Sequence, residues 1–337
     1  MTIYPLLMAP CFRHGIETPW GGNVLRDIFM KDAPDEITGE SLEVSVLPGY
    51  ESMIGNGEHA GKPLSRVVEL WGEALTGTQD GSLPLLLKLI DAQKPLSVQV
   101  YPDHPYALEH EGKPGKSEAW VILEAEPGAK IVYGVDADGA DLGEAVAQGR
   151  LAGVLHWENV RPGDVFHIPA GLVHAIGEGV LCYVIQTSSD VIYRLWDWDR
   201  PGLDGKPREL HVKKALDVVE PGLHLKKNEG TTVLCKGGSR TYYISDKNFE
   251  LCRLNVSGRM PLDSGRMLLL TAMGPCALRW NGGEMEIAPF ASVIVPAALE
   301  GAVIEGETKV LMSCLPNREA LIKELGYRAE NVSGLLD

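Results

Sequence analysis

The chain has 337 residues, 45% of them hydrophobic and 23% charged, and 31 basic against 46 acidic residues give a formal net charge of −15. This length allows two or three domains, each with its own core, and the acidic surplus opposes binding to nucleic acid or to an anionic membrane. No apolar run reaches the ~18 residues of a membrane span, and the N-terminus lacks the pattern of a secretion signal.

Cysteine usage indicates a reducing compartment. The six cysteines are scattered along the chain, and no two of them form a C-x-x-C pair. This pattern is typical of reduced, mostly buried thiols, and neither a disulfide framework nor a cysteine metal cluster would show it. We therefore expect a cytoplasmic protein.

The N-terminal part predicts a turn, a strand and a helix. In the sequence TPWGG, Trp20 lies at the tip of a turn, where it either caps a pocket or covers the face of a sheet. Residues 41–47 alternate in the manner of a strand, and its polar face, which carries Glu43, lines a cleft or, as is commoner, faces water. Apolar residues recur at helical spacing over 63–75, which predicts a surface helix.

Three strands with polar side chains follow. In LPLLLKLI, residues 83–90, an unpaired ammonium is costly to bury, so Lys88 extends to an edge or projects into a functional cavity. Period-two alternation gives the next two strands one polar face each. These faces carry Ser97, Gln99 and Tyr101 on the first strand, and Lys116, Glu118 and Trp120 on the second.

The stretch VRPGDVFHIPAGLVHAI, residues 160–176, predicts a turn, a short strand, a Pro-Ala-Gly turn and an inward-facing histidine, His174. A buried histidine is more often a hydrogen-bonded core residue than a metal ligand. If the sheet curls, however, Gln99 and Glu118 face inward with it. Two oxygen donors and one nitrogen suit zinc or another divalent first-row metal with an open position.

A second stretch, IAPFASVIVPAALEGAV at residues 287–303, repeats this pattern. Pro169 aligns with Pro296, 127 residues later, and His174 aligns with Gly301. This spacing is too long for a solenoid repeat and fits a duplicated domain. The second copy keeps the turn and has lost the histidine, which predicts a single site.

Arg194 lies in an aromatic tract, IYRLWDWDR, that follows another predicted strand at 180–187. Its side chain alternates away from the apolar neighbours, so it either faces the cavity as an anion clamp or pairs with Asp197 or Asp199 at the surface. The remainder of the chain is rich in strands and turns and ends in a predicted helix at 317–325.

Seven blocks in the same order resemble the type I mannose-6-phosphate isomerases, in the short bacterial form. Ordered blocks are far more specific than a single motif, and they cover about residues 1–220, with a looser likeness beyond. The blocks are TPWGG, LPLLLKLIDA, LSVQVYPD, GKSEAW, GDVFHIPAGLVHAIG, SDVIYRLWDWDR and RELHVKKALDV.

The resemblance implies a fold dominated by β-strands, with two cupin-like jelly-roll β-barrels in tandem and a few short α-helices. An N-terminal cupin domain, 1–225, would carry the metal site and helical insertions at about 63–76 and 140–155. A cupin-like domain without metal ligands, 231–315, and a C-terminal helix and tail, 316–337, would follow.

Family members bind one zinc through a glutamine and a histidine on one strand, a glutamate on the next and a histidine after the PAG turn. By resemblance, Gln99, Glu118 and His174 take three of these roles, and the remaining histidine falls on Tyr101. A phenol, with its pKa near ~10, must lose a proton to bind as phenolate, whereas neutral imidazole binds at pH 7. Four outcomes stay open: ligation by Tyr101, a three-ligand site completed by water, rescue by His104, or no tightly held metal.

The resemblance also implies an activity, the interconversion of mannose 6-phosphate and fructose 6-phosphate through a cis-enediol. It makes Arg194 and Lys116 the catalytic residues and assigns substrate binding to Ser97, Lys88 and Trp20. The expected partners are a small-molecule sugar phosphate and one Zn²⁺ or similar metal per chain, in a monomer or homodimer. The alternative is a non-catalytic or altered-specificity sugar-phosphate-binding cupin, because Tyr101 stands where the family has histidine.

Overall fold

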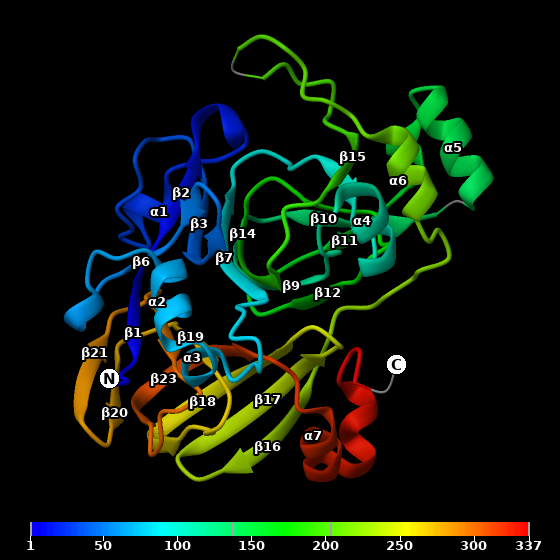
Figure 1. Ribbon diagram of the computed structural model, residues 1–337. Helices are drawn as coiled ribbons and strands as arrows, with labels where there is room; N and C mark the ends of the chain where they lie inside the picture. The colour runs from blue at the N-terminus through cyan, green and yellow to red at the C-terminus, as the bar shows by residue number, and fades with distance from the viewer. Residues whose placement is uncertain (1, 137, 203, 336–337) are drawn as a thin grey trace. The chain divides into compact units, whose positions relative to one another are not determined.

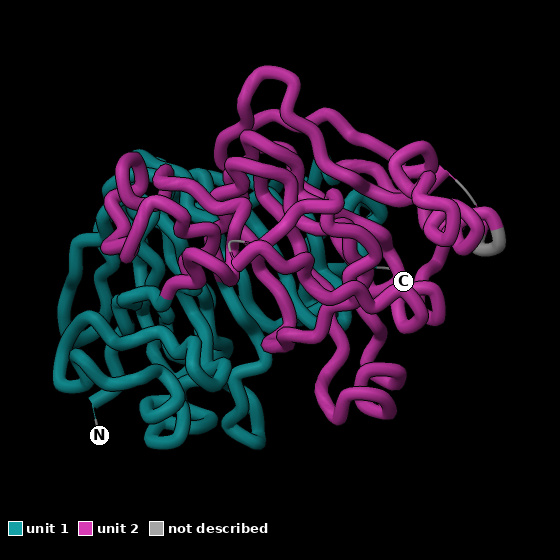
Figure 2. The backbone as a smooth tube through the Cα atoms, turned by 90° about the horizontal axis from the view of Figure 1, so that it is seen from above, with its two compact units in different colours: residues 1–11, 42–87, 228–337 teal, residues 12–41, 88–227 magenta. Residues whose placement is uncertain are grey.

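The computed structural model describes residues 2–136, 138–202 and 204–335, which consist mainly of β-strands (Figure 1). The chain forms two compact units (Figure 2): unit 1 contains residues 1–11, 42–87 and 228–337, and unit 2 contains 12–41 and 88–227. The sequence predicts one continuous N-terminal domain, 1–225, so the observed grouping differs for 1–11 and 42–87. The reason is a long-range pairing in unit 1, where Leu6 lies opposite Ile294.

Unit 1 contains an antiparallel sheet of ten strands. Its longest pair runs from Glu250 opposite Cys314 to Pro261 opposite Val303. The strand order is β16-β17-β18-β23-β19-β22-β1-β6, and β20 pairs with β21 and β23. The bounds are β16 (Thr231–Cys235), β17 (Gly238–Ser245), β18 (Glu250–Pro261), β23 (Val303–Cys314), β19 (Leu268–Ala272), β22 (Ser292–Val295), β1 (Leu6–Ala9), β6 (Met53–Ile54), β20 (Cys276–Trp280) and β21 (Gly283–Ile287).

Alternation along β18 explains the core of unit 1. Cys252, Leu254 and Val256 are buried in it, whereas Arg253 and Asn255 between them are partly exposed. One face of the strand therefore packs and the other meets solvent. A C-terminal helix covers part of this core with two leucines, and its Asn317 cap and Gly326 end confirm the predicted helix.

Unit 1 also contains a partly buried ion-pair cluster. Arg266 Nη2 lies 3.2 Å from Glu250 Oε1 and 2.8 Å from Asp263 Oδ2, and these residues line a cavity of about 280 Å³. The side chain of Glu250 is only 2% exposed. Arg266 therefore supplies the nearest countercharge to a buried carboxyl.

We expect Arg266→Met to lower the free energy of unfolding by about 3 kcal/mol, because it leaves Glu250 buried without that countercharge. Urea unfolding at pH 7 measures the change. Arg259→Met is the control, because Arg259 forms an exposed pair with Glu305 that is worth at most about 1 kcal/mol. Equal losses in the two variants would show that the cluster contributes no more than a surface pair.

Two further sheets position the residues of unit 2. The chain passes from one unit to the other inside β2 (Cys11–His14), β3 (Thr38–Val44) and β7 (Leu85–Ala92). One has the order β12-β9-β14-β7-β3-β2, the other β11-β10-β13-β8-β15, and neither closes on itself within the described residues. The first comprises β12 (Val165–Ile168), β9 (Glu118–Ala125), β14 (Val180–Thr187), β7 (Leu85–Ala92), β3 (Thr38–Val44) and β2 (Cys11–His14). The second comprises β11 (Leu155–Asn159), β10 (Lys130–Val135), β13 (His174–Ile176), β8 (Val98–Val100) and β15 (Tyr193–Trp196).

The remaining elements are short. Gly72, at φ 48°, separates α2 (Leu64–Trp71) from α3 (Glu73–Thr76) and divides the single helix predicted over 63–75. Glu43 is buried because β3 is an inner strand, so the expectation that it faces water is wrong. The helices are α1 (Val24–Asp27), α2 (Leu64–Trp71), α3 (Glu73–Thr76), α4 (His104–Glu111), α5 (Gly139–Ala147), α6 (Val212–Val218) and α7 (Arg318–Leu325), and β4 (Val46–Leu47) pairs with β5 (Tyr50–Glu51).

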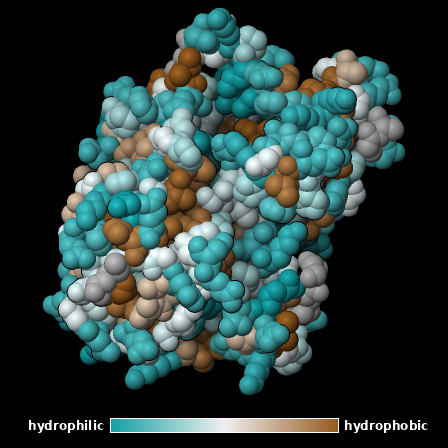
Figure 3. All heavy atoms as spheres, viewed as in Figure 1, coloured by the Kyte–Doolittle hydropathy of each residue, from teal (hydrophilic) through white to brown (hydrophobic). Residues whose placement is uncertain are grey.

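Polar residues dominate the surface seen in Figure 3, and hydrophobic residues show in smaller patches. Among the described helices, none combines the length and the apolar character that crossing a membrane requires. The prevalence of strands agrees with the predicted β-dominated class. The predicted tail includes 336–337, which lie outside the described residues.

Candidate active site

His174 opens β13 (His174–Ile176), three residues after Gly171 of the Pro-Ala-Gly turn. Gly171 in this turn has φ +86°, a left-handed conformation that glycine adopts without a Cβ penalty. The imidazole is fully buried, and its Nδ1 lies 2.9 Å from Leu172 O, a carbonyl that can only accept. The ring therefore carries its proton on Nδ1, and Nε2 keeps a lone pair with no hydrogen-bond partner.

Glu118, the first residue of β9, is the centre of a converging set of donors. Its Oε1 accepts from Tyr101 OH at 3.0 Å and from Trp120 Nε1 at 2.8 Å. Its Oε2 lies 3.2 Å from the ammonium of Lys116. The predicted shared face of Lys116, Glu118 and Trp120 is confirmed by these contacts.

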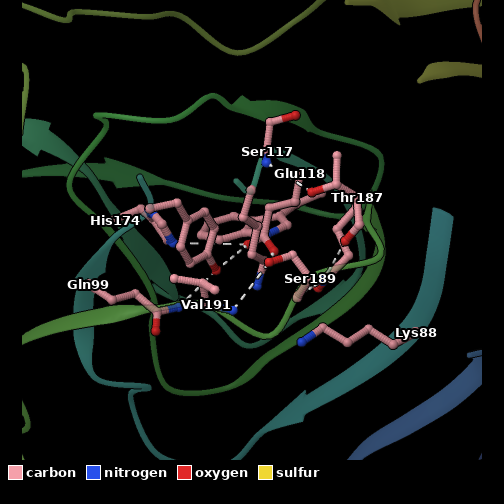
Figure 4. A network of polar contacts seen from close by, with 12 residues as sticks. Lys88, Gln99, Ser117, Glu118, His174, Thr187, Ser189 and Val191 are labelled. Atoms are coloured by element: carbon pink, nitrogen blue, oxygen red, sulfur yellow. Dashed lines mark hydrogen bonds and ion pairs between the residues drawn. The ribbon is translucent and has the colours of Figure 1, made fainter. Parts of the chain in front are cut away.

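Gln99 and Tyr101 extend this network from the strand β8. Gln99 lies opposite His174 in the ladder between β8 and β13, and its Nε2 donates to Tyr101 OH at 3.0 Å. His174 Nε2 is 4.0 Å from Glu118 Oε1. Figure 4 shows Gln99, Glu118 and His174 converging from three different strands, so the structure brings the three predicted ligands together.

A second buried ion pair involves Lys88 on β7. Its Nζ donates to Glu40 Oε1 at 2.7 Å, and Arg13 Nη1 lies 3.4 Å from the other carboxylate oxygen. Lys88 is therefore buried and paired. Sequence reasoning missed Glu40, although a lysine within an apolar strand requires an acidic partner on a neighbouring buried strand.

Burial and the ion pairs set the charges of this cluster. Burial lowers the pKa of His174 to about 4 despite the attraction of Glu118, and lowers the pKa of Lys116 to about 8 against the same attraction. Burial disfavours the charge on Glu118, but the surrounding positive charges, led by the ammonium of Lys116, and the hydrogen bond from Trp120 together outweigh burial and bring that pKa to about 2. Burial, reinforced by Glu118, raises the pKa of Tyr101. At pH 7 the cluster therefore holds a neutral imidazole, a carboxylate, an ammonium and a phenol.

The neutral imidazole predicts a loss of stability on acidification. Between the ordinary pKa of 6.5 and the folded value of about 4, the unfolded chain binds a proton that folded His174 does not, so stability is lost as the pH falls through this window. From pH 7 to pH 5 we expect His174 to cost about 2 kcal/mol of unfolding free energy. Urea unfolding of the wild type and of His174→Gln at both values measures it, and an equal loss in both proteins would contradict the assignment.

The other predicted residues lie close to this cluster or in the core. Arg194 is half-buried opposite Gln99 on β15, where Nη1 donates to Glu209 O and Nε is buried without a hydrogen-bond partner. Asp197 instead pairs with Arg200 and Arg208. Trp20 is buried in the same apolar core cluster as Tyr101. Ser97 is also buried, whereas His104 is exposed at the start of α4.

The residues present fit a bound metal. The separation of 4.0 Å between His174 Nε2 and Glu118 Oε1 is too long for a hydrogen bond, and two zinc–ligand bonds of ~2.0–2.2 Å each can span it. The Nδ1–H bond to a carbonyl is also typical of a ligating histidine. In the described part of the chain no three His, Cys, Asp or Glu residues form a metal cluster, so a third protein ligand would be Gln99 or Tyr101.

Comparisons with known proteins place the chain in a family. A family model described as phosphomannose isomerase type I, catalytic domain, matches residues 14–118. The mannose-6-phosphate isomerase of Streptococcus mutans is 33% identical over 87% of this chain and 94% of that protein. One from Bacillus subtilis is 36% identical over 94% and 100%, and a crystal structure of the B. subtilis enzyme matches with a TM-score of 0.86 and 30% identity, covering 92% of this chain and 99% of that one. The chain therefore belongs to the type I phosphomannose isomerase family.

Proposed function

We propose that the chain is a metal-dependent mannose-6-phosphate isomerase, which interconverts mannose 6-phosphate and fructose 6-phosphate through a cis-enediol. The observation that carries the proposal is the buried set of His174, Glu118 and Lys116 in a chain of this family. A non-catalytic sugar-phosphate-binding cupin is not favoured, because these groups lie together in charge states suited to chemistry.

The reaction moves a proton from C2 of the open-chain aldose to C1, and negative charge develops on the oxygens attached to these carbons. Lys116 Nζ, held between the carboxylate of Glu118 and the ring of Tyr101, donates to one of these oxygens. Its pKa of about 8 also permits proton exchange near neutral pH. Arg194, with its unpartnered Nε, stabilises the same charge as a second fixed cation.

One zinc ion per chain would be held by His174 Nε2, Glu118 and Gln99. When bound, zinc would act as a Lewis acid that polarises the two oxygens of the substrate. Since His174 is neutral and Glu118 is ionised at pH 7, neither ligand has to lose a proton first.

Lys88, Ser97 and Trp20 are the proposed substrate-binding residues, of which Lys88 carries the charge that suits a phosphate. We expect Lys88→Met to raise KM for mannose 6-phosphate about ten- to a hundredfold, the value of one charge-assisted hydrogen bond, with a smaller effect on kcat. Steady-state kinetics measure both constants. Lys94→Met, at an exposed lysine just after β7, is the control, and an unchanged KM in Lys88→Met would remove Lys88 from the substrate site.

We also propose a fold, a cellular location and an oligomeric state for the chain. Two tandem cupin-like jelly rolls would account for the repeated strand-and-proline pattern, which forms β12 before Pro169 and β22 before Pro296. All six cysteines are free thiols, which supports a cytoplasmic location. We propose a monomer or homodimer that binds neither nucleic acid nor membrane.

A coupled assay tests the activity. Purified zinc-loaded protein is given mannose 6-phosphate, and the formation of fructose 6-phosphate is followed through a linked dehydrogenase. Turnover that disappears with a chelator and returns with zinc is the expected result. No turnover in fully zinc-loaded protein would overturn the proposed function, and turnover on another aldose phosphate alone would change the substrate.

A further inference from the structure

The hydroxyl of Tyr101 lies between two of the proposed metal ligands. It is 3.0 Å from Gln99 Nε2 and 3.0 Å from Glu118 Oε1. Because an ionised carboxylate can only accept, the phenolic proton points at Glu118, and the phenolic oxygen accepts from the amide of Gln99. The hydroxyl thus directs the amide NH₂ of Gln99, and not its carbonyl oxygen, toward the cluster.

We propose that Tyr101 is a positioning residue that competes with the metal for Gln99 and Glu118, so that the metal is held weakly and exchanges readily. This inference rests on the metal site of the proposed function. It adds that the tyrosine hydroxyl is not a ligand and that it favours the metal-free form of the cluster.

The energetic reason is the number of contacts that a metal must replace. An ion that binds Glu118 Oε1 and Gln99 removes the hydrogen bond from Tyr101 to the carboxylate and requires the amide to turn. A hydrogen bond to a charged group is among the stronger ones in proteins. Lys116, 3.2 Å from Glu118 Oε2, additionally repels a second cation. Among the proposed ligands, only His174 Nε2 has no hydrogen bond to lose when a metal binds.

The packing of the ring allows the hydroxyl to be tested by itself. Lys116 Nζ lies 4.1 Å from the centroid of the Tyr101 ring, and the ring of His174 packs against it at 4.3 Å. Tyr101→Phe keeps both contacts and removes only the hydroxyl. Tyr133→Phe is a matched control, because Tyr133 is equally buried in the same unit and its hydroxyl donates to His167 O, outside the cluster.

The experiment compares zinc affinity in four full-length proteins, freed of metal and titrated with Zn²⁺ against a chromophoric chelator at pH 7: wild type, Tyr101→Phe, Tyr101→His and Tyr133→Phe. We expect Tyr101→Phe to bind zinc roughly ten- to a hundredfold more tightly than wild type, the range set by one hydrogen bond to a charged group. Tyr101→His should bind zinc at least as tightly as Tyr101→Phe, because it adds a nitrogen ligand. The zinc affinity of Tyr133→Phe should match that of wild type. Circular dichroism of each metal-free variant checks that it is folded.

Two results would overturn the inference. Equal or weaker zinc binding by Tyr101→Phe would make the hydroxyl a bystander or a ligand, and a tyrosinate signal in the ultraviolet difference spectrum of zinc-loaded wild type, absent from Tyr101→Phe, would identify it as a ligand. An isomerase assay on the same samples separates the two proposals: tighter binding without turnover refutes the function and supports the inference. Turnover together with an unchanged zinc affinity of Tyr101→Phe supports the function and refutes the inference.

Discussion

Glu118→Gln should lower kcat/KM for mannose 6-phosphate at least about a thousandfold. The substitution removes a proposed anionic metal ligand and the countercharge of buried Lys116. The loss of even one preorganised electrostatic contact in an active site costs about 10²–10³ in rate. Glutamine has the same shape, so the effect reports the charge. Steady-state kinetics and zinc content of the purified variant measure the two consequences.

Glu124→Gln provides the matched control for this variant. Glu124 lies on the same strand, β9, where its side chain is exposed, so kcat/KM should stay within a factor of about two, as for a surface substitution. If Glu118→Gln kept more than a tenth of the wild-type kcat/KM with full zinc content, the carboxylate would have no central role.

Lys116→Met should reduce kcat/KM about a hundred- to a thousandfold, the range for a lost fixed donor to developing negative charge. It leaves Glu118 with only the neutral donors Tyr101 and Trp120, so the pKa of Glu118 rises as well. The basic limb of the pH–rate profile provides a second readout. Wild type should show a limb near pH 8 from Lys116, and the variant should lack it.

The exposed Lys113, paired with Asp190, supplies the comparison for this second variant. Lys113→Met should keep both the rate and the basic limb of the profile. A Lys116→Met protein that retained the limb near pH 8 would assign that titration to another group and would remove the proton-exchange role from Lys116.

Local structure was predictable where glycine and proline lie at the ends of short apolar runs. Strand β14 occupies the predicted range 180–187, and β12 (Val165–Ile168) is the short strand predicted within 160–176. Both were predictable because turn residues limit each run. The division of the chain into units was not predictable in this way. It depends on the pairing of Leu6 with Ile294, a contact between distant segments that no local pattern encodes.

The candidate site was predictable in its composition and not in its internal contacts. Alternation and resemblance selected Gln99, Glu118 and His174, which do lie together. Which atoms are paired follows from strand register and side-chain geometry, so the hydroxyl contact of Tyr101 with Glu118 appeared only in three dimensions.

The proposed metal site holds one cation between His174 and Glu118, and diffraction from zinc-loaded crystals at wavelengths on either side of the zinc absorption edge locates that cation. We predict a single anomalous peak per chain, bonded to His174 Nε2 and to a carboxylate oxygen of Glu118. A zinc-saturated crystal whose anomalous peaks all lie away from these two side chains would contradict the account.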